Sequence, residues 1–222
     1  MLPTPPFPDL LLLDLRGQFR SASWQMAVDE AILQMGSALP ILRLYRWAAP
    51  VITFGYFQEV AGVQSTSGAP LQRRWTGGGV VEHGEDFAYS LILPARDRLA
   101  RGKAQESYRV IHRCLAQSLV QCGLPAVLSE DALGSGNACF QHPVAGDVLC
   151  NGKKIAGAAQ RRGRFGVLHQ GSVQAACPGL ATIFPSLLSL RTATVSLDPT
   201  TSAAADRLDE EKYATDKWKW LR

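Results

Sequence analysis

Residues with the potential for acyl-transfer chemistry are concentrated between positions 137 and 173 of this chain. Cys139 follows small residues, Lys154 comes just after the pair Asn151-Gly152, and His169 is expected in a glycine-bounded loop. A cysteine thiolate is a strong nucleophile, and a nearby lysine favours the thiolate and stabilises negative charge on a carbonyl oxygen. We therefore interpret this stretch as the reacting half of an acyl-transfer site.

Each of these side chains also has a structural interpretation. Cys139 belongs to no expected helix face or strand, which favours a nucleophile, although a packed loop cysteine is the alternative. Lys153 and Lys154 should point to opposite faces of a strand, so that one is solvated and the other projects toward a pocket. For His169 we favour a hydrogen-bonded structural role over that of a base.

A glycine-rich loop at Gly77–Gly79 would supply the other half of the site. Backbone N–H groups without side chains can hold an anion or lie flat against an extended ligand, and Arg73 and Arg74 add positive charge. The alternative is a mobile surface loop with two solvated arginines. Strand-like runs precede and follow the loop, which predicts a hairpin-like element, whereas dinucleotide and Walker motifs need a helix after the loop.

Hydrophobic patterning predicts an α+β fold, with a mostly antiparallel sheet and helices packed against it. The pair Asn151-Gly152 is a strong hairpin signal. Asp29 and Glu30, on the first expected helix, are interpreted as solvated or structural. We expect helices at about 21–35, 105–123 and 206–221, and strands at 9–15, 41–47, 51–54, 71–75, 87–93, 147–150, 153–160 and from 163 to 173.

Composition limits the classes of protein to which the chain can belong. With 222 residues, 46% of them hydrophobic, it can bury a sizeable core without disulfides or metals. A net charge of +4 without a basic run argues against nucleic acid and would suit an acidic partner or an anionic ligand. The five cysteines form no C-x-x-C pair, so we expect no disulfide framework and no metal site, and we expect Cys114, Cys122 and Cys150 in the core.

The N-terminal segment has no features of a secretory signal, and no apolar run approaches the roughly 20 residues that span a membrane. We therefore expect a soluble, cytoplasmic protein that does not associate with membranes. The expected organisation is a single catalytic domain over residues 1–222, with its core at about 9–218 and no C-terminal accessory domain.

Three motifs together resemble the signature of the lipoate-protein ligase and octanoyltransferase family, which is related to biotin protein ligases. They are RRWTGGGVVEHGEDFAYSLIL at 73–93, GKKIAGAAQRR at 152–162 and LHQGSV at 168–173. Weaker similarities at MAVDEAIL, LRLYRW and KYATDKW extend the resemblance from about Leu10 to Trp218. The α+β sheet domain of that family agrees with the fold expected from patterning.

The resemblance implies roles for individual residues. Lys154 matches the family lysine that contacts the acyl carbonyl, and N-A-C-F at 137–140 resembles octanoyltransferases that form an acyl-enzyme on a loop cysteine, here Cys139. The implied substrate-binding residues are Arg74, Gly77, Gly78, Gly79, His83, Gly157, Ala158, His169 and Gly171.

The activity implied by these matches is transfer of an octanoyl or lipoyl group from acyl carrier protein, through a Cys139 thioester, to a lysine of a lipoyl domain such as glycine cleavage H protein. This reaction needs no cofactor, because the carrier thioester is already activated. One alternative is an ATP-dependent lipoate-protein ligase, which forms a lipoyl-adenylate and needs ATP and Mg. Another is a non-catalytic protein that binds a lipoyl domain or an acyl ligand.

Overall fold

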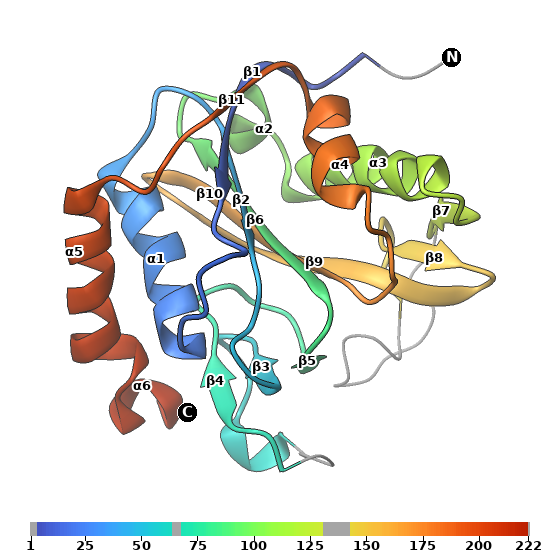
Figure 1. The fold of residues 1–222 in the computed structure, drawn as a ribbon. Coiled ribbons are helices and arrows are strands. Elements are labelled where there is room, and N and C mark those ends of the chain that lie inside the picture. The colour runs from blue at the N-terminus through green and yellow to red at the C-terminus, as the bar shows by residue number, and fades with distance from the viewer. Residues whose placement is uncertain (1–3, 64–67, 131–142, 222) are drawn as a thin grey trace.

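The computed structural model describes residues 4–63, 68–130 and 143–221. It is an α+β structure with an eight-stranded sheet, a three-stranded sheet and helices on both faces of the larger sheet (Figure 1). The expected fold class, a mostly antiparallel sheet with packed helices, is confirmed.

Parallel pairing is confined to one edge of the larger sheet. The strands of this sheet are β1 (Phe7–Asp14), β2 (Ile41–Tyr45), β6 (Phe87–Pro94), β7 (Ala126–Leu128), β8 (Val148–Cys150), β9 (Lys153–Gly163), β10 (Gly166–Val173) and β11 (Ser189–Thr194). Their order is β11-β1-β2-β6-β10-β9-β8-β7. β1 is parallel to both of its neighbours, and every other neighbouring pair is antiparallel.

The smaller sheet carries the glycine-rich loop. It consists of β3 (Val51–Phe54), which is parallel to β4 (Leu71–Arg73) and antiparallel to β5 (Val81–His83). The expected hairpin between the strands around this loop is wrong, because β4 lies in the smaller sheet and β6 in the larger one. After β4 the backbone N–H of Arg74 donates to the carbonyl oxygen of Phe54, so the chain continues along β3. β5 is too short to show an alternating pattern in the sequence.

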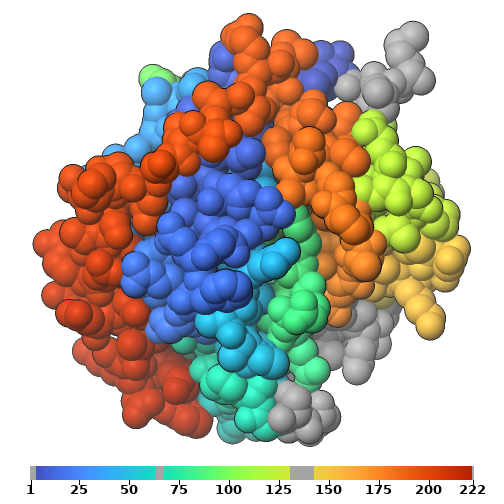
Figure 2. All heavy atoms as spheres, in the orientation of Figure 1, coloured from blue at the N-terminus to red at the C-terminus, as the bar shows by residue number. Residues whose placement is uncertain are grey.

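Helices cover both faces of the larger sheet. The helices are α1 (Ala22–Met35), α2 (Arg98–Arg101), α3 (Ala104–Gln121), α4 (Leu180–Leu188), α5 (Pro199–Leu208) and α6 (Asp216–Lys219), with a 3-10 turn η1 (Val60–Gly62) and a π-helical turn η2 (Asp209–Tyr213). Leu91 on β6 faces α3 and α4, whereas the next residue, Ile92, faces α1 and α5. In Figure 2 the C-terminal residues (red) accordingly border the N-terminal residues (blue).

Helix boundaries follow the capping residues. α1 begins after Ser21, whose side chain accepts from the N–H of Trp24, and it ends before Gly36, as the sequence predicts. The expected terminal helix at 206–221 has the wrong boundaries. α5 begins at Pro199, capped by Asp198, and the chain then passes through η2 before α6 begins after Thr215.

The cysteines depart from expectation at one pair. Cys122, at the end of α3, forms a disulfide with Cys177, just before α4. The expectation that Cys122 is simply a packed core residue is therefore wrong, because the spacing of cysteines in a sequence does not reveal which of them meet in space. Cys114 is free and buried, as expected, whereas the expectation of a core position for Cys150 is wrong, because this free cysteine is only half-buried.

The described part of the chain contains no cluster of histidine, cysteine or acidic side chains suited to a metal ion. Within the same residues, no helix has the length and apolar character needed to cross a membrane.

Candidate functional site

A turn and a bulge together aim Lys154. Asn151 and Gly152 both have positive φ, 49° and 75°, and form the tight turn between β8 and β9. Val148 then pairs with Ala156, whereas Leu149 pairs with Lys154, so β9 has one extra residue here. This bulge shifts the alternation of side chains. As a result Lys154 lies against Gly157, where a Cβ atom would be 2.6 Å from Cε and 2.9 Å from Nζ of the lysine.

Lys154 is paired with a buried carboxylate. Its Nζ lies 2.7 Å from Oδ2 of Asp147, and the two side chains are 2% and 0% exposed. Oδ1 of Asp147 accepts from the hydroxyl of Tyr108 at 2.5 Å, and that hydroxyl accepts from the N–H of Ala158 at 2.9 Å. Burial and the charge of Asp147 raise the pKa of Tyr108 well above its usual value, which keeps its hydroxyl protonated as a donor. The lysine is thus connected through side chains to the backbone of β9.

A narrow pocket lies in front of this arrangement. Five of the residues implied by the motifs line it: Arg74, His83, Gly157, Ala158 and Gly171. Much of the remaining wall is apolar and comes from Met26, Tyr45, Trp47, Val81 and Ala159. Lys154 lies behind the wall at Gly157 rather than on it. The combination of small and apolar residues suits an acyl chain.

The glycine-rich loop is held by Arg74. The guanidinium of this arginine donates from Nη2 to the carbonyl oxygens of Gly77, at 3.0 Å, and Gly79, at 2.8 Å. Gly55 supports the loop from below, because a Cβ atom there would lie 2.0 Å from the carbonyl oxygen of Gly78. The lack of a side chain at Gly55 therefore allows the backbone of the loop to pack directly against the chain at the end of β3.

Arg73 has a structural task of its own. It is fully buried, and its Nη1 donates to the carbonyl oxygens of Tyr56 and Gln58 at 2.8 and 2.9 Å. Its Nε donates to the carbonyl oxygens of Trp218, at 3.0 Å, and Lys219, at 3.2 Å. The interpretation of both arginines as solvated is wrong, since each binds backbone carbonyls that the tertiary fold brings to it.

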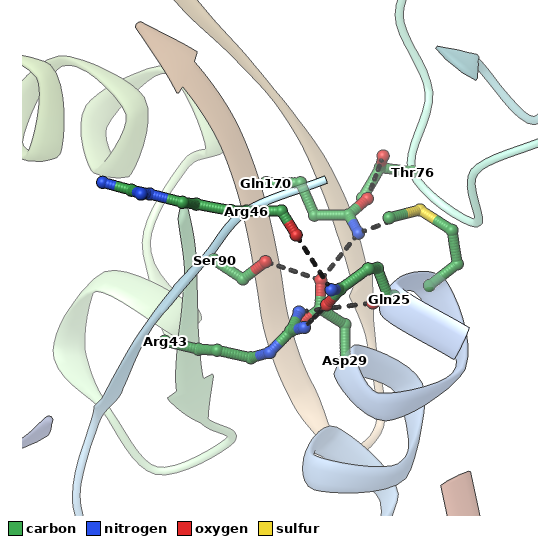
Figure 3. Close-up of polar contacts among 8 residues, drawn as sticks. Gln25, Asp29, Arg43, Arg46, Thr76, Ser90 and Gln170 are labelled. Atoms are coloured by element: carbon green, nitrogen blue, oxygen red, sulfur yellow. Dashed lines mark hydrogen bonds and ion pairs between the residues drawn. The ribbon is translucent and has the colours of Figure 1, made fainter. Parts of the chain in front are cut away.

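A buried polar cluster connects α1 with the glycine-rich loop (Figure 3). Asp29 pairs with Arg43 at 2.8 Å, and both side chains are fully buried. The same carboxylate accepts from Ser90 at 2.5 Å and from Gln170 at 2.8 Å, and Gln170 accepts from Thr76, next to the loop, at 2.7 Å. Of the two interpretations of Asp29, the structural one therefore fits and the solvated one does not.

The second acidic residue of α1 is buried in the same way. Glu30 accepts from Tyr213 and pairs with Lys212, both on η2, and is 4% exposed. It therefore helps to attach the C-terminal helical segment to α1.

His83 is held from both sides of its ring. Its Nδ1 lies 2.7 Å from Oδ2 of Asp86, and its Nε2 lies 2.8 Å from Oγ1 of Thr53. Asp86 also accepts from Ser172 at 2.6 Å. Burial raises the pKa of Asp86, but hydrogen bonds from His83, Ser172 and the N–H of Gly84 outweigh that effect and hold the pKa below its usual value. Asp86 is therefore ionised.

His169 is fully buried on β10 rather than in a loop. Its ring nitrogens meet Gln160 at 3.0 Å and Tyr89 at 3.3 Å. Burial lowers the pKa of His169 well below its usual value, so the ring is neutral. This geometry fits the structural role favoured from the sequence.

Of the expected catalytic pair, Lys154 is placed and Cys139 is not, because Cys139 lies outside the described residues. Four partners of the site were not identified from the sequence: Thr53, Asp86, Tyr108 and Asp147. Asp86, three residues after His83, carries a weak local signal. The others come from distant elements, and single-sequence patterning cannot pair them.

The chain matches the lipoyl protein ligase A/B catalytic domain over residues 21–188. It is 36% identical to octanoyltransferase LipM of Kyrpidia tusciae over 170 residues and 32% identical to octanoyltransferase LipM of Oceanobacillus iheyensis over 164 residues. Each match covers 69% of this chain, but only 62% and 60% of the respective relative.

The fold has a counterpart in solved structures. A bi-partite lipoate protein ligase from Thermoplasma acidophilum superimposes with a TM-score of 0.74 at 22% identity, covering 97% of this chain and 98% of that one. The family motifs, the fold and the matched residues agree, and the chain belongs to the lipoyl protein ligase A/B catalytic domain family.

Proposed function

We propose that this chain is an octanoyltransferase. It takes an octanoyl (or lipoyl) group from acyl carrier protein onto Cys139 and passes it to a lysine of a lipoyl domain, in the cytoplasm and without a cofactor. The observation that carries the proposal is the position of Lys154, set by a bulge against Gly157 at the wall of a small, largely apolar pocket. Similarity to relatives named octanoyltransferase LipM supports the choice of acyl group.

The chemistry follows from the groups at the pocket. In the first half-reaction the thiolate of Cys139 attacks the carrier thioester, a new C–S bond forms, and the carrier thiolate leaves. In the second the neutral acceptor amine attacks, a C–N bond forms, the C–S bond breaks, and the leaving Cys139 thiolate takes the proton that the nitrogen loses. Lys154, oriented by Asp147 behind the wall at Gly157, stabilises the oxyanion of both tetrahedral intermediates.

The substrate-binding assignments remain part of this proposal. Gly157, Ala158 and Gly171 offer a flat wall for the acyl chain, and Arg74 with Gly77, Gly78 and Gly79 shapes the loop at its side. His83 lines the same pocket, whereas His169 is bonded to Gln160 and does not line it.

Intact-mass analysis after incubation with octanoyl-acyl carrier protein tests the nucleophile. We expect the mass of one octanoyl group on the wild-type chain and none on Cys139→Ala. Cys150→Ala is the matched control, since this half-buried free cysteine lies on β8 close to the same turn, and it should still be acylated. Acyl transfer by Cys139→Ala at the wild-type rate without ATP would show that Cys139 is not the nucleophile.

The same assay separates the alternatives. Product that appears only with free lipoate, ATP and Mg, and that survives Cys139→Ala, identifies an ATP-dependent ligase. Binding of a lipoyl domain or an acyl ligand without covalent product under either condition identifies a non-catalytic binder.

A further inference from the structure

A hydroxyl, an imidazole and a carboxylate lie in series at the pocket. Thr53 Oγ1 is 2.8 Å from Nε2 of His83, and Nδ1 of His83 is 2.7 Å from Oδ2 of Asp86. Thr53 and His83 both line the pocket. The three residues come from β3, β5 and the turn before β6, so the series is a product of the tertiary fold.

The neighbouring groups fix the direction of each hydrogen bond. Asp86 is ionised, so Nδ1–H of His83 donates to it, and in this tautomer Nε2 is the acceptor. Arg74 donates from Nη1 to Oγ1 of Thr53 at 2.7 Å, so the hydroxyl proton of Thr53 is directed to Nε2. A hydroxyl oxygen has two lone pairs. Among the described contacts Arg74 takes one of these lone pairs and no donor takes the other; Thr53 is 0% exposed, so its hydroxyl is buried in the pocket wall.

We propose that Thr53, His83 and Asp86 form a proton relay that deprotonates the acceptor lysine amine. The ammonium of the acceptor lysine first gives a proton to Oγ1 of Thr53 while the proton of Thr53 passes to Nε2 of His83. The neutral amine then attacks the acyl carbonyl, the C–N bond forms and the C–S bond to the enzyme breaks. The leaving thiolate takes the second proton from the attacking nitrogen, and the imidazolium of His83 later releases the first proton to solvent, so that protons and electrons balance over the step.

The surroundings of the relay fit this task. Asp86 stabilises the imidazolium that forms on His83, and the guanidinium of Arg74 stabilises negative charge developing on Thr53. The ring of Trp47 lies against His83 with centroids 4.4 Å apart, which limits access of water. A lysine amine has a pKa near 10.4 in water, so it needs a base to react at neutral pH.

The relay rests on the proposed function for the identity of the acyl group, but it does not depend on Cys139. A lysine amine loses a proton whether its target is a thioester or an adenylate. The two ideas can therefore fail separately.

The experiment measures the second half-reaction alone, from isolated octanoyl-enzyme to a lipoyl domain. We expect Thr53→Val, which keeps the volume of the side chain but removes the hydroxyl, to slow transfer by about 10²-fold, in the range of general base catalysis. Thr53→Ser restores the hydroxyl and should recover most of the rate. Asp86→Asn should also slow transfer, with Glu85→Gln as its control, because Glu85 is an exposed neighbour in the same turn.

Hydroxylamine separates a relay from a structural role. It is largely unprotonated at neutral pH and should release the octanoyl group equally fast from the wild type and from Thr53→Val. Transfer to the lipoyl domain by a folded Thr53→Val at the wild-type rate would overturn the proposal, and so would equal slowing with hydroxylamine and with the protein acceptor.

If Thr53→Val fails to fold, Asp86→Asn is compared with Glu85→Gln instead. Both variants are assayed with the lipoyl domain and with hydroxylamine, and the same outcomes support or overturn the relay. If the wild type forms no octanoyl-enzyme, the proposed transferase fails. The relay is then judged by comparing the same variants in the reaction supplied with lipoate, ATP and Mg.

Discussion

The absence of a side chain at Gly157 makes room for Lys154. The aliphatic end of the lysine occupies the space in which a side chain at residue 157 would stand. We expect Gly157→Ala to displace Nζ and to lower acyl transfer at least about 10-fold, because misplacements of about 1 Å can cost 10²-fold in rate. Gly163→Ala, at the open end of the same strand, meets nothing within 4 Å and is the control. Equal rates for both variants would contradict this role of Gly157.

The carboxylate beside Lys154 should matter for stability as well as for rate. Asp147→Asn leaves a buried ammonium without its counter-ion, and breaking a buried pair in this way costs about 3–5 kcal/mol. We expect a loss of this order in the free energy of unfolding, measured by urea denaturation. Combining it with Lys154→Met removes the ammonium that has lost Asp147 and should recover part of the loss. A double variant less stable than Asp147→Asn alone would contradict this explanation.

At the level of elements, the polar cluster of Figure 3 couples a helix to a loop. Thr76→Val removes the donor to Gln170 and leaves a buried amide oxygen without that partner, which costs about 1–3 kcal/mol. Because Thr76 directly precedes the glycine-rich loop, we also expect a higher KM for the acyl donor. Urea denaturation and steady-state kinetics measure the two effects. A loss of stability with an unchanged KM would show that the cluster does not position the loop.

The elements also show how far a single sequence can be read. Where the signal is local it is reliable: Ser21 begins α1, Asn151-Gly152 makes the turn into β9, and apolar spacing marks α3. The signal fails where tertiary contacts decide. Nothing near Arg73 in the sequence indicates that Trp218 and Lys219 supply its acceptors, and the bulge that aims Lys154 depends on the register with β8.

The same limit applies to the site. The motifs placed Arg74, His83, Gly157, Ala158 and Gly171 at one pocket, and the structure brings these residues together. The hydrogen-bonded partners behind them come from strands and helices far apart in the chain. A single sequence gives no information on such pairings, and for that reason the second layer of the site was not predicted.

For the molecule as a whole, two buried histidines set a dependence of stability on pH. Burial lowers the pKa of His112 to about 4, and it also lowers the pKa of His169 well below its usual value. The unfolded chain takes up these protons below about pH 6.5, whereas the folded protein does not. The two neutral rings therefore contribute their full stabilisation above about pH 6.5, and this contribution is lost as the pH falls toward 4. His112 accounts for about 3 kcal/mol of it.

Urea denaturation at several pH values between 7.5 and 4.5 measures this effect. We expect the free energy of unfolding to fall through that range, and we expect His112→Gln to weaken the pH dependence, because it removes one of the two groups. A free energy of unfolding that stays constant from pH 7.5 to 4.5 would contradict the assignment of both rings as neutral in the folded state.

The parallel edge of the larger sheet has a consequence for synthesis on the ribosome. β1 is made first, but its outer neighbour β11 begins only at Ser189, so the outer backbone groups of β1 stay unpaired until most of the chain has been translated. An open, leucine-rich strand edge can pair with another nascent chain. We therefore expect a chain stalled before β11 to aggregate more readily than the full-length chain.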